Sequence, residues 1–410
     1  MATCDLERMF DDWASMVITI TVDLRNEKAS HCPFGSPDRR SRFEPQRVAL
    51  ENASGKVLEE LRQPRSFQRN VNHFGPLCAL TKNDLIGQRQ DNQEQIRMTS
   101  TNDAKATMKA VRIHAFGGPE ELRYEDAPRP APKAGEVLIR IYASAVNPAD
   151  WKLRSGFFGK DIPLPLTLGF DFSGVIDTLG EGVTRWKVGD EVYGYALGAY
   201  AEYIALKESM TVAKPKSVDH IHAAAIASAS LTAWKALFET AGLKAGQKVL
   251  IHGATGGVGG FAVQLAHAKG IHVIGTASQR NQAHLKQLGA DEAIDYEAGR
   301  FEDVVHDVDA VFDTQGGDTQ ARSWNVLKRG GILVSIAQPP SQAEAVKYGV
   351  RATMALNEMK AESLNAITEL VDSGKLQAVV DTVLPLSEVR RAHELIQTGH
   401  TRGKIALKVI

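Results

Sequence analysis

Glycines gather in the segment KVLIHGATGGVGG, residues 248–260, in a pattern that could bind a phosphate. A run of aliphatic residues ends at the first glycine, and a helical pattern begins near the last. The glycines of the pattern are Gly253, Gly256, Gly257 and Gly259, and Gly260 follows them. At a strand-to-helix turn, glycines let the backbone approach a pyrophosphate, and free N–H groups of the helix favour the anion. Because the G-x-x-G-G-x-G spacing differs from the commoner G-x-G-x-x-G, the prediction depends on the flanking strands and helix. The alternative is a tight turn that needs glycine only for packing.

The residues after the second strand indicate which dinucleotide binds. NAD-binding proteins place an acidic residue there for the ribose hydroxyl, but residues 275–287, GTASQRNQAHLKQ, contain no Asp or Glu. Ser278, Arg280 and Asn281 instead offer hydrogen-bond donors to a 2'-phosphate. At about 4 Å and an effective dielectric near 20, one such charge pair is worth about 4 kcal/mol before solvation costs. The sequence therefore predicts NADPH. The alternative is that Arg280 lies in the solvated first turn of a helix.

The elements around these residues divide into two kinds. From Gly246, strand and helix patterns alternate, as in a parallel, doubly wound sheet of Rossmann type, which we place at residues 229–370. Residues 108–228 contain short β-branched segments separated by Gly or Pro, which predict a β-rich domain. Residues 371–410 end in a strand, IALKVI, that could complete this β-rich domain.

Residues 1–107 do not resemble either part. They contain only four of the 35 glycines and lack sustained strand or helix periodicity, so we predict an N-terminal extension that is mostly disordered. A transit peptide is one alternative, although such peptides avoid acids like the four near the start, Asp5, Glu7, Asp11 and Asp12. An over-extended start is the other, since Met98 and Met108 are in frame.

Composition excludes several classes of partner. The chain has 410 residues with 48 Lys and Arg against 49 Asp and Glu, which argues against nucleic acid or an anionic membrane surface. No apolar run approaches the roughly 18 residues of a membrane span. The only cysteines are Cys4, Cys32 and Cys78, so no disulfide or cysteine-ligated zinc is possible after residue 78. The reducing cytoplasm is the predicted compartment.

Several separated motifs after Met108 resemble the zinc-independent medium-chain dehydrogenase/reductases, in particular the quinone oxidoreductase and alkenal/enone reductase group. The motifs are VNPADWKLRSG (146–156), LGFDFSGVI (168–176), SLTAWKAL (230–237), LGADEAIDY (288–296) and GHTRGKIAL (399–407). The resemblance implies an α/β protein with a GroES-like catalytic domain at 108–228, completed by 371–410, beside the Rossmann domain. It also suggests a homodimer, and continuation of the sheet near GILVSIA, residues 331–337, is one route to it.

The same motifs predict that there is no metal site. Zinc-dependent relatives have a G-H-E-x-x-G segment whose histidine binds the metal, and here the matching residues are Gly169, Phe170 and Asp171. Phenylalanine cannot ligate zinc.

The resemblance also implies roles for individual residues. Asn147 corresponds to the residue lining the nicotinamide side of the cleft, and Thr232 to a nicotinamide contact. Tyr296 corresponds to a residue that stacks near the adenine ribose phosphate, and Lys404 to a family end motif without a clear role. The implied pyrophosphate loop comprises Thr255, Gly256, Gly257 and Val258. For each of these residues the alternative is a purely structural role, such as capping a helix, forming a turn or packing at the surface.

The predicted activity is NADPH-dependent hydride transfer to a quinone, enone or alkenal, without zinc and with solvent as the default proton donor. Five tyrosines of the β-rich domain could protonate the product, but strand tyrosines more often pack: Tyr142, Tyr193, Tyr195, Tyr200 and Tyr203. One alternative is an NADPH-binding protein without turnover. Another is an enoyl thioester reductase, although Phe158 stands near the position of that group's proton-donating tyrosine.

Overall fold

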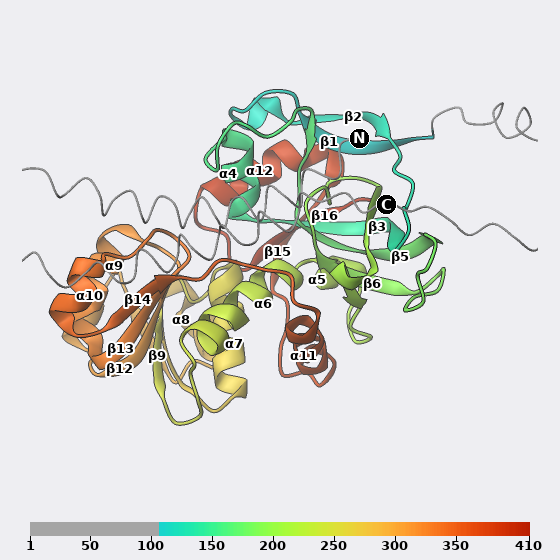
Figure 1. Ribbon diagram of the computed structural model, residues 1–410. Coiled ribbons are helices and arrows are strands. Elements are labelled where there is room, and N and C mark those ends of the chain that lie inside the picture. The colour runs from blue at the N-terminus through green and yellow to red at the C-terminus, as the bar shows by residue number, and fades with distance from the viewer. Residues whose placement is uncertain (1–105) are drawn as a thin grey trace, which may run out of the picture. The chain divides into compact units, whose positions relative to one another are not determined.

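The computed structural model describes residues 106–410 (Figure 1). The first strand, β1 (Thr107–Ile113), begins where strand-like patterning starts in the sequence. The disorder predicted for residues 1–107 concerns almost entirely residues outside the described part.

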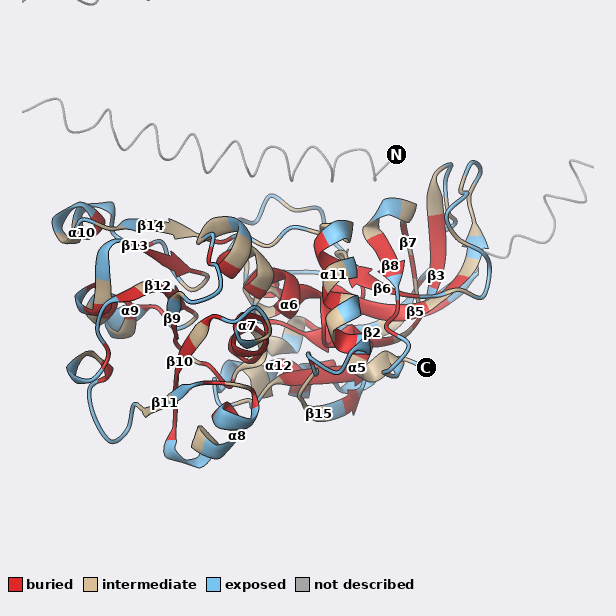
Figure 2. Cartoon of the chain, turned by 90° about the horizontal axis from the view of Figure 1, so that it is seen from below, coloured by how far each residue is buried: buried red, intermediate tan, exposed pale blue. Residues whose placement is uncertain are grey.

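The β-rich domain consists of a three-stranded and a seven-stranded sheet. The small sheet is antiparallel with the order β2-β1-β4, and the large sheet has the order β15-β16-β3-β5-β6-β8, with β7 paired to β3. Its elements are β2 (Arg123–Pro128), β3 (Glu136–Val146), α4 (Pro148–Ser155), β4 (Leu166–Thr167), β5 (Asp171–Leu179), β6 (Glu191–Tyr195), β7 (Tyr203–Lys207), β8 (Thr211–Ala213) and α5 (His220–Ala224). Strand β3 is buried along most of its length (Figure 2). It pairs with β16 and β7 on one side and with β5 on the other.

The second domain is a six-stranded parallel sheet with the order β11-β10-β9-β12-β13-β14. Its elements are α6 (Ala227–Trp234), β9 (Lys248–Ile251), α7 (Gly257–Ala268), β10 (His272–Ala277), α8 (Gln282–Gln287), β11 (Glu292–Asp295), β12 (Val308–Asp313), α9 (Gly317–Ser323), β13 (Leu327–Ser335), α10 (Gln342–Tyr348), β14 (Arg351–Met354) and α11 (Ala361–Asp372). The strand order reverses between β9 and β12, which is where doubly wound sheets bind nucleotides. The predicted fold class, GroES-like plus Rossmann, is confirmed.

The end of the chain returns to the β-rich domain through β15 (Val380–Pro385), α12 (Val389–Gln397) and β16 (Lys404–Lys408). Strand β16 pairs antiparallel with β3, so that Ile405 faces Val146 across the ladder. The start of β16 also forms an isolated parallel bridge, Gly256 with Gly403. The last strand thereby contacts both the large sheet and the glycine-rich turn.

Helix α6 lies where the two sheets meet. It packs on α7 and α11 and also contacts β6 of the large sheet. The hydroxyl of Tyr193 in β6 is 2.8 Å from Thr368 Oγ1 in α11. One apolar cluster therefore extends from β6 through α6 into the parallel sheet. Within residues 106–410, none of the helices combines the length and apolarity that crossing a bilayer requires.

Candidate functional site

The glycine-rich turn connects β9 to α7, as the sequence predicts. Gly253 has φ +61°, a left-handed conformation that favours glycine. A Cβ on Gly259 would lie 2.1 Å from the carbonyl oxygen of Gly253, so this close approach also requires glycine. Gly256 caps α7, and the first N–H groups of that 12-residue helix are left free to bind an anion.

Residues from the end of the chain also contact this turn. The N–H of Gly403 donates to the carbonyl oxygen of Thr255 at 3.1 Å. A Cβ on Gly257 would lie 3.1 Å from Lys404 Cδ. Thr255 is buried, and Val258 is partly exposed at the start of α7. Of the four predicted loop residues, all but Val258 thus lie against Gly403 or Lys404, a relationship that the local sequence pattern does not reveal.

The predicted 2'-phosphate residues follow the end of β10. Ser278 is buried and its hydroxyl accepts a hydrogen bond from Asn281 Nδ2 at 3.3 Å, whereas Arg280 is exposed. Tyr296 is 55% exposed beside them, and its N–H donates to the carbonyl oxygen of Ala277 at 3.4 Å.

The fold also brings a carboxylate to this place. Glu297 Oε2 accepts a hydrogen bond from the N–H of Gln279 at 3.4 Å. Sequence reasoning confined to residues 275–287 missed this acid because it follows the next strand, β11. A carboxylate here would disfavour a 2'-phosphate, whereas the Arg280 guanidinium would favour one.

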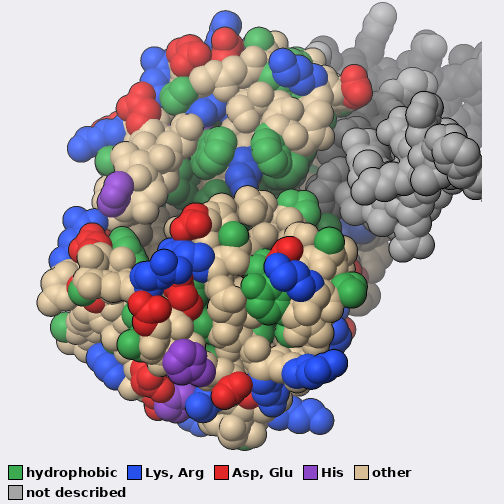
Figure 3. All heavy atoms as spheres, turned by 90° about the vertical axis from the view of Figure 1, so that its left-hand side faces the viewer, with side chains coloured by type: hydrophobic (Ala, Val, Ile, Leu, Met, Phe, Trp, Pro, Cys, Tyr) green, Lys and Arg blue, Asp and Glu red, His purple; other side chains and the backbone are tan. Residues whose placement is uncertain are grey.

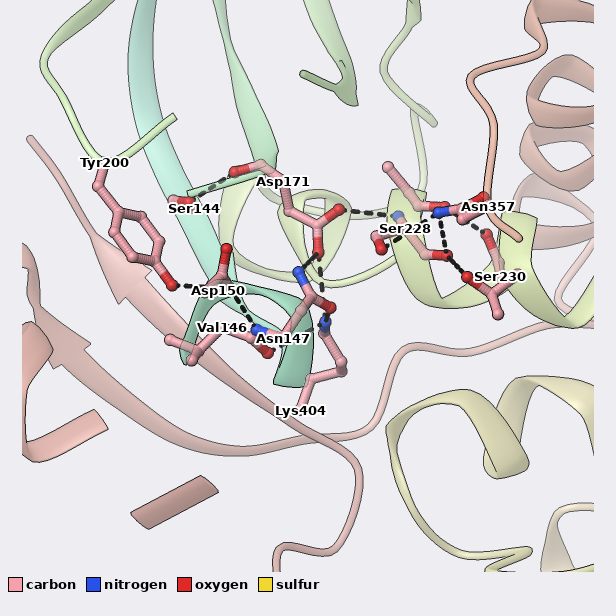
Figure 4. A network of polar contacts seen from close by, with 12 residues as sticks. Ser144, Val146, Asn147, Asp150, Asp171, Tyr200, Ser228, Ser230, Asn357 and Lys404 are labelled. Atoms are coloured by element: carbon pink, nitrogen blue, oxygen red, sulfur yellow. Dashed lines mark hydrogen bonds and ion pairs between the residues drawn. The ribbon is translucent and has the colours of Figure 1, made fainter. Parts of the chain in front are cut away.

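A buried polar cluster joins three elements of the β-rich domain and includes Asn147 (Figure 4). Asn147 Nδ2 donates to Asp171 Oδ2 at 2.9 Å. Lys404 Nζ donates to Asn147 Oδ1, to Asp171 Oδ2 at 3.2 Å and to the Val146 carbonyl oxygen at 3.3 Å. All three N–H donors of the ammonium are therefore engaged, and the side-chain amide of Asn147 is held in one orientation.

This cluster lies almost entirely away from solvent. The Lys404 side chain is 4% exposed and that of Asp171 is 0% exposed. Burial raises the pKa of Asp171, while the charge of Lys404 and the hydrogen bond from Asn147 oppose that increase. The pairing compensates part of the cost of burying each charge.

A second carboxylate lies beneath Asn147. The local sequence NPAD explains its position, because Asn147 caps α4, proline follows, and Asp150 is the third helical residue of a capping box. Asp150 Oδ2 accepts from the N–H of Asn147 at 2.6 Å and from the Tyr200 hydroxyl at 2.9 Å. Its Oδ1 is buried without a partner. Burial raises the pKa of Asp150 to about 7.

The cluster continues into α6, which contains Thr232. Asp171 Oδ1 accepts from the N–H of Ser228 at 2.8 Å, and the Ser228 carbonyl oxygen accepts from the Thr232 hydroxyl at 2.7 Å. Asp171 thus links the strand that follows Phe170 to the helix that carries Thr232 (Figure 4). The structure brings Asn147 and Thr232 into one network. Sequence reasoning did not identify Asp171 and Lys404 as the residues that connect it.

Phe170 occupies the position at which zinc-dependent relatives have a histidine. It is buried, and its ring stacks on Tyr195 with centroids 5.2 Å apart. Among residues 106–410, no three His, Cys, Asp or Glu side chains come together as a possible metal site.

The histidine nearest the glycine-rich turn is a packing residue, as its apolar sequence context predicts. His252 is buried between the hydroxyls of Thr276 and Ser323, at 3.2 and 2.9 Å. Burial lowers its pKa to about 4. It is therefore neutral at physiological pH and bonded on both ring nitrogens.

The surface between the two domains is hollowed on the face drawn in Figure 3. A furrow separates the upper lobe from the lower one, and apolar side chains gather in it. A GroES-like domain and a Rossmann domain that meet at a glycine-rich turn and a buried polar cluster define the class: a two-domain dehydrogenase or reductase.

Comparison with known proteins identifies the family. The model for an alcohol dehydrogenase GroES-like domain matches residues 133–216, and that for a zinc-binding dehydrogenase matches residues 288–407. The chain is 35% identical over 399 residues to 2-methylene-furan-3-one reductase of Solanum lycopersicum, with 88% of this chain and 99% of the relative covered. The chain therefore belongs to the medium-chain dehydrogenase/reductase family, in its quinone and enone reductase group, which confirms the resemblance seen in the sequence.

Other relatives agree with this assignment. The chain is 32% identical to the human mitochondrial NAD(P)H oxidoreductase RTN4IP1, with 77% of this chain and 92% of the relative covered. A quinone oxidoreductase from Coxiella burnetii has a TM-score of 0.70 and 37% identity, with 74% of this chain and all of that one covered. The Escherichia coli quinone oxidoreductase, solved with NADPH, has a TM-score of 0.68 and 27% identity, with 73% and 100% covered.

Proposed function

We propose that this chain is an NADPH-dependent reductase that transfers hydride to quinones or α,β-unsaturated carbonyl compounds without zinc. The observation that carries the proposal is the buried Lys404–Asp171 pair, which holds Asn147 beside the glycine-rich turn. In zinc-dependent relatives a metal provides the positive charge at such a site. Here an ammonium lies beside the carboxylate, and Phe170 replaces the metal-binding histidine.

The residues of the turn fit a dinucleotide. The free N–H groups at the start of α7 would hold the pyrophosphate next to Thr255, Gly256, Gly257 and Val258. Ser278, Arg280 and Asn281 would hold the 2'-phosphate, with the exposed Tyr296 ring beside it. The NADPH named in the Escherichia coli structure supports this choice. The carboxylate of Glu297 would disfavour the 2'-phosphate, so the preference for NADPH over NADH depends on Arg280.

The domains have separate tasks in this proposal. Residues 229–370 bind the cofactor, and residues 108–228 with 371–410 shape the acceptor site, since β16 pairs with β3. Bound NADPH supplies a hydride from C4 of its nicotinamide ring. Asn147 and Thr232 would face that ring, and Asn147 retains one N–H donor that is not used within the cluster. A conjugated acceptor spreads the developing negative charge, so hydrogen-bond donors can replace a metal.

We further propose a cytoplasmic homodimer. The expectation that the sheet continues near residues 331–337 is wrong in its strand, because that segment lies in β13, which is paired on both sides by β12 and β14. The edge of the parallel sheet is β14 (Arg351–Met354), and an equivalent strand of a second copy could pair with it. The reducing cytoplasm suits a chain with only three cysteines. Light scattering would measure the mass in solution, and cell fractionation with N-terminal peptide mapping would locate the mature protein.

Consumption of NADPH, followed by its absorbance with a panel of quinones, enones and alkenals, tests the activity. Turnover of at least one class, in protein that contains less than stoichiometric zinc by mass spectrometry, is the expected result. Tight NADPH binding with no acceptor consumed would instead support the non-catalytic alternative. Preferential reduction of an enoyl thioester would support the other one, which Phe158 disfavours.

A further inference from the structure

Tyr195 is the last residue of β6, the strand that pairs with β5. It stands directly opposite Asp171 in the antiparallel pairing of β5 and β6. Residues that face each other across such a ladder project their side chains from the same face of the sheet. Tyr195 also packs against apolar residues of both domains, so its ring lies where the two cores meet.

The Tyr195 hydroxyl differs from those of neighbouring tyrosines because it has no hydrogen-bond partner within residues 106–410. Tyr193 bonds to Thr368, and Tyr200 donates to Asp150. Among the hydrogen bonds of residues 106–410, none involves the Tyr195 hydroxyl, and this oxygen is also not fully enclosed by protein. It therefore reaches accessible space, while its ring is fixed by stacking on Phe170.

The surroundings keep this hydroxyl protonated. Burial raises the pKa of Tyr195, and the nearby charges of Asp171 and Asp150 raise it further. The geometric link to the cluster that holds Asn147 is the pairing of Tyr195 with Asp171 across the two strands. A phenol with a raised pKa stays protonated at neutral pH, so it can donate a hydrogen bond without giving up its proton.

We propose that Tyr195 is a catalytic residue whose hydroxyl donates a hydrogen bond to the carbonyl or quinone oxygen of the acceptor. The inference rests on the proposed function and assigns the oxygen-binding part of the site. The β-carbon of an enone forms a C–H bond with the hydride, and the π electrons move onto the oxygen to give an enolate. Tyr195 stabilises that oxyanion and keeps its own proton. Loss of the hydride leaves the nicotinamide oxidised. Water then protonates the α-carbon of the enolate, which yields the saturated ketone and releases hydroxide to the solvent.

The Tyr195→Phe variant tests this role, because it removes only the hydroxyl and retains the ring on Phe170. We expect kcat/KM for an enone to fall about 100-fold, mainly through kcat, as for other single oxyanion donors. The dissociation constant for NADPH, measured by fluorescence, should not change. Tyr193→Phe is the matched control in the same strand, and it should retain kcat/KM because its hydroxyl bonds to α11.

A binding measurement separates this inference from the proposed function. The oxidised cofactor complex is titrated with 4-nitrophenolate, a planar mimic of an enolate oxygen, and followed by difference absorbance. About tenfold weaker binding to Tyr195→Phe than to the wild type supports the donor role even if no acceptor is reduced. Equal phenolate affinity of the two proteins overturns the inference, whether or not the wild type reduces enones.

Discussion

Lys404 and Asp171 form a buried ion pair between residues 233 positions apart, with Nζ 3.2 Å from Oδ2. The pair lies between the two domains, since Asp171 also accepts from α6 and Lys404 touches the glycine-rich turn. Asn147 is bonded to both members. A single charge pair thus connects the predicted nicotinamide-facing amide to the predicted phosphate loop.

The first prediction concerns this pair. Replacing Lys404 with Met leaves Asp171 buried without its counter-charge, which should lower the free energy of unfolding by about 3–5 kcal/mol. Urea denaturation measures it. Combining Lys404→Met with Asp171→Asn should recover part of the loss. Lys408→Met, at the exposed end of the same strand, is the control and should change stability by less than about 0.5 kcal/mol.

The second prediction concerns pH. The pKa of Asp150 is about 7 in the folded protein against an ordinary 3.8, so the folded state binds this proton more tightly. The contribution of Asp150 to the free energy of unfolding therefore decreases as the pH rises from about 4 to 7, and it is constant outside that range. Asp150→Asn abolishes the titration. The free energy of unfolding of the variant minus that of the wild type should therefore be about 2 to 3 kcal/mol larger at pH 8 than at pH 5.

The matched control for this prediction is Asp161→Asn, which alters an exposed carboxyl. Its stability relative to the wild type should be the same at both pH values. A difference between Asp150→Asn and the wild type that is also independent of pH would show that Asp150 ionises normally.

The third prediction concerns cofactor choice. Arg280→Asp exchanges an exposed cation for an anion near the predicted 2'-phosphate, and the ratio of NADPH to NADH affinity should fall at least about tenfold, since solvent screens the full charge effect. Glu297→Gln should shift the ratio in the opposite direction, because it removes the carboxylate beside Gln279. Isothermal titration with both nucleotides measures the ratios. Unchanged ratios in both variants would place the 2'-phosphate elsewhere.

The fourth prediction compares neighbouring glycines of α7. A Cβ on Gly259 would meet the Gly253 carbonyl oxygen at 2.1 Å, so Gly259→Ala must displace the turn and should weaken NADPH binding at least about 100-fold or prevent folding. On Gly260 the nearest atom is Leu288 Cδ1 at 3.6 Å, an ordinary contact. Gly260→Ala should therefore preserve binding and raise stability by about 0.5–1 kcal/mol. Equal nucleotide affinity of the two variants contradicts the steric argument.

Local patterns in the sequence predicted those parts of the site whose conformation depends on residues that are neighbours in the chain. Glycine spacing and the strand before it located the turn between β9 and α7, because backbone conformation there depends on neighbouring residues. Alternation of strands and helices predicted the parallel sheet for the same reason.

The remainder of the site depends on contacts between distant segments. Nothing in a single sequence indicates that Lys404 and Asp171 lie close together. The pairing of both β16 and β5 with β3 brings them together. The sequence pattern did not indicate Glu297, because this residue follows β11, whereas the residues expected to determine cofactor choice follow β10. Tyr195 was grouped with four other tyrosines, and its hydroxyl could be distinguished only once the partners of Tyr193 and Tyr200 were known.

The position of Lys404 in the last strand affects how the protein folds during its synthesis on the ribosome. Asn147 is synthesised 257 residues before the lysine that holds its side chain. Until β16 is synthesised, the second half of β3, from Ala143 to Val146, lacks a partner strand on one side, and Asp171 lacks its cation. A nascent chain can therefore form most of both sheets and still have no finished reaction centre. In the proposed function, the site is complete only when Lys404 reaches Asn147 and Asp171.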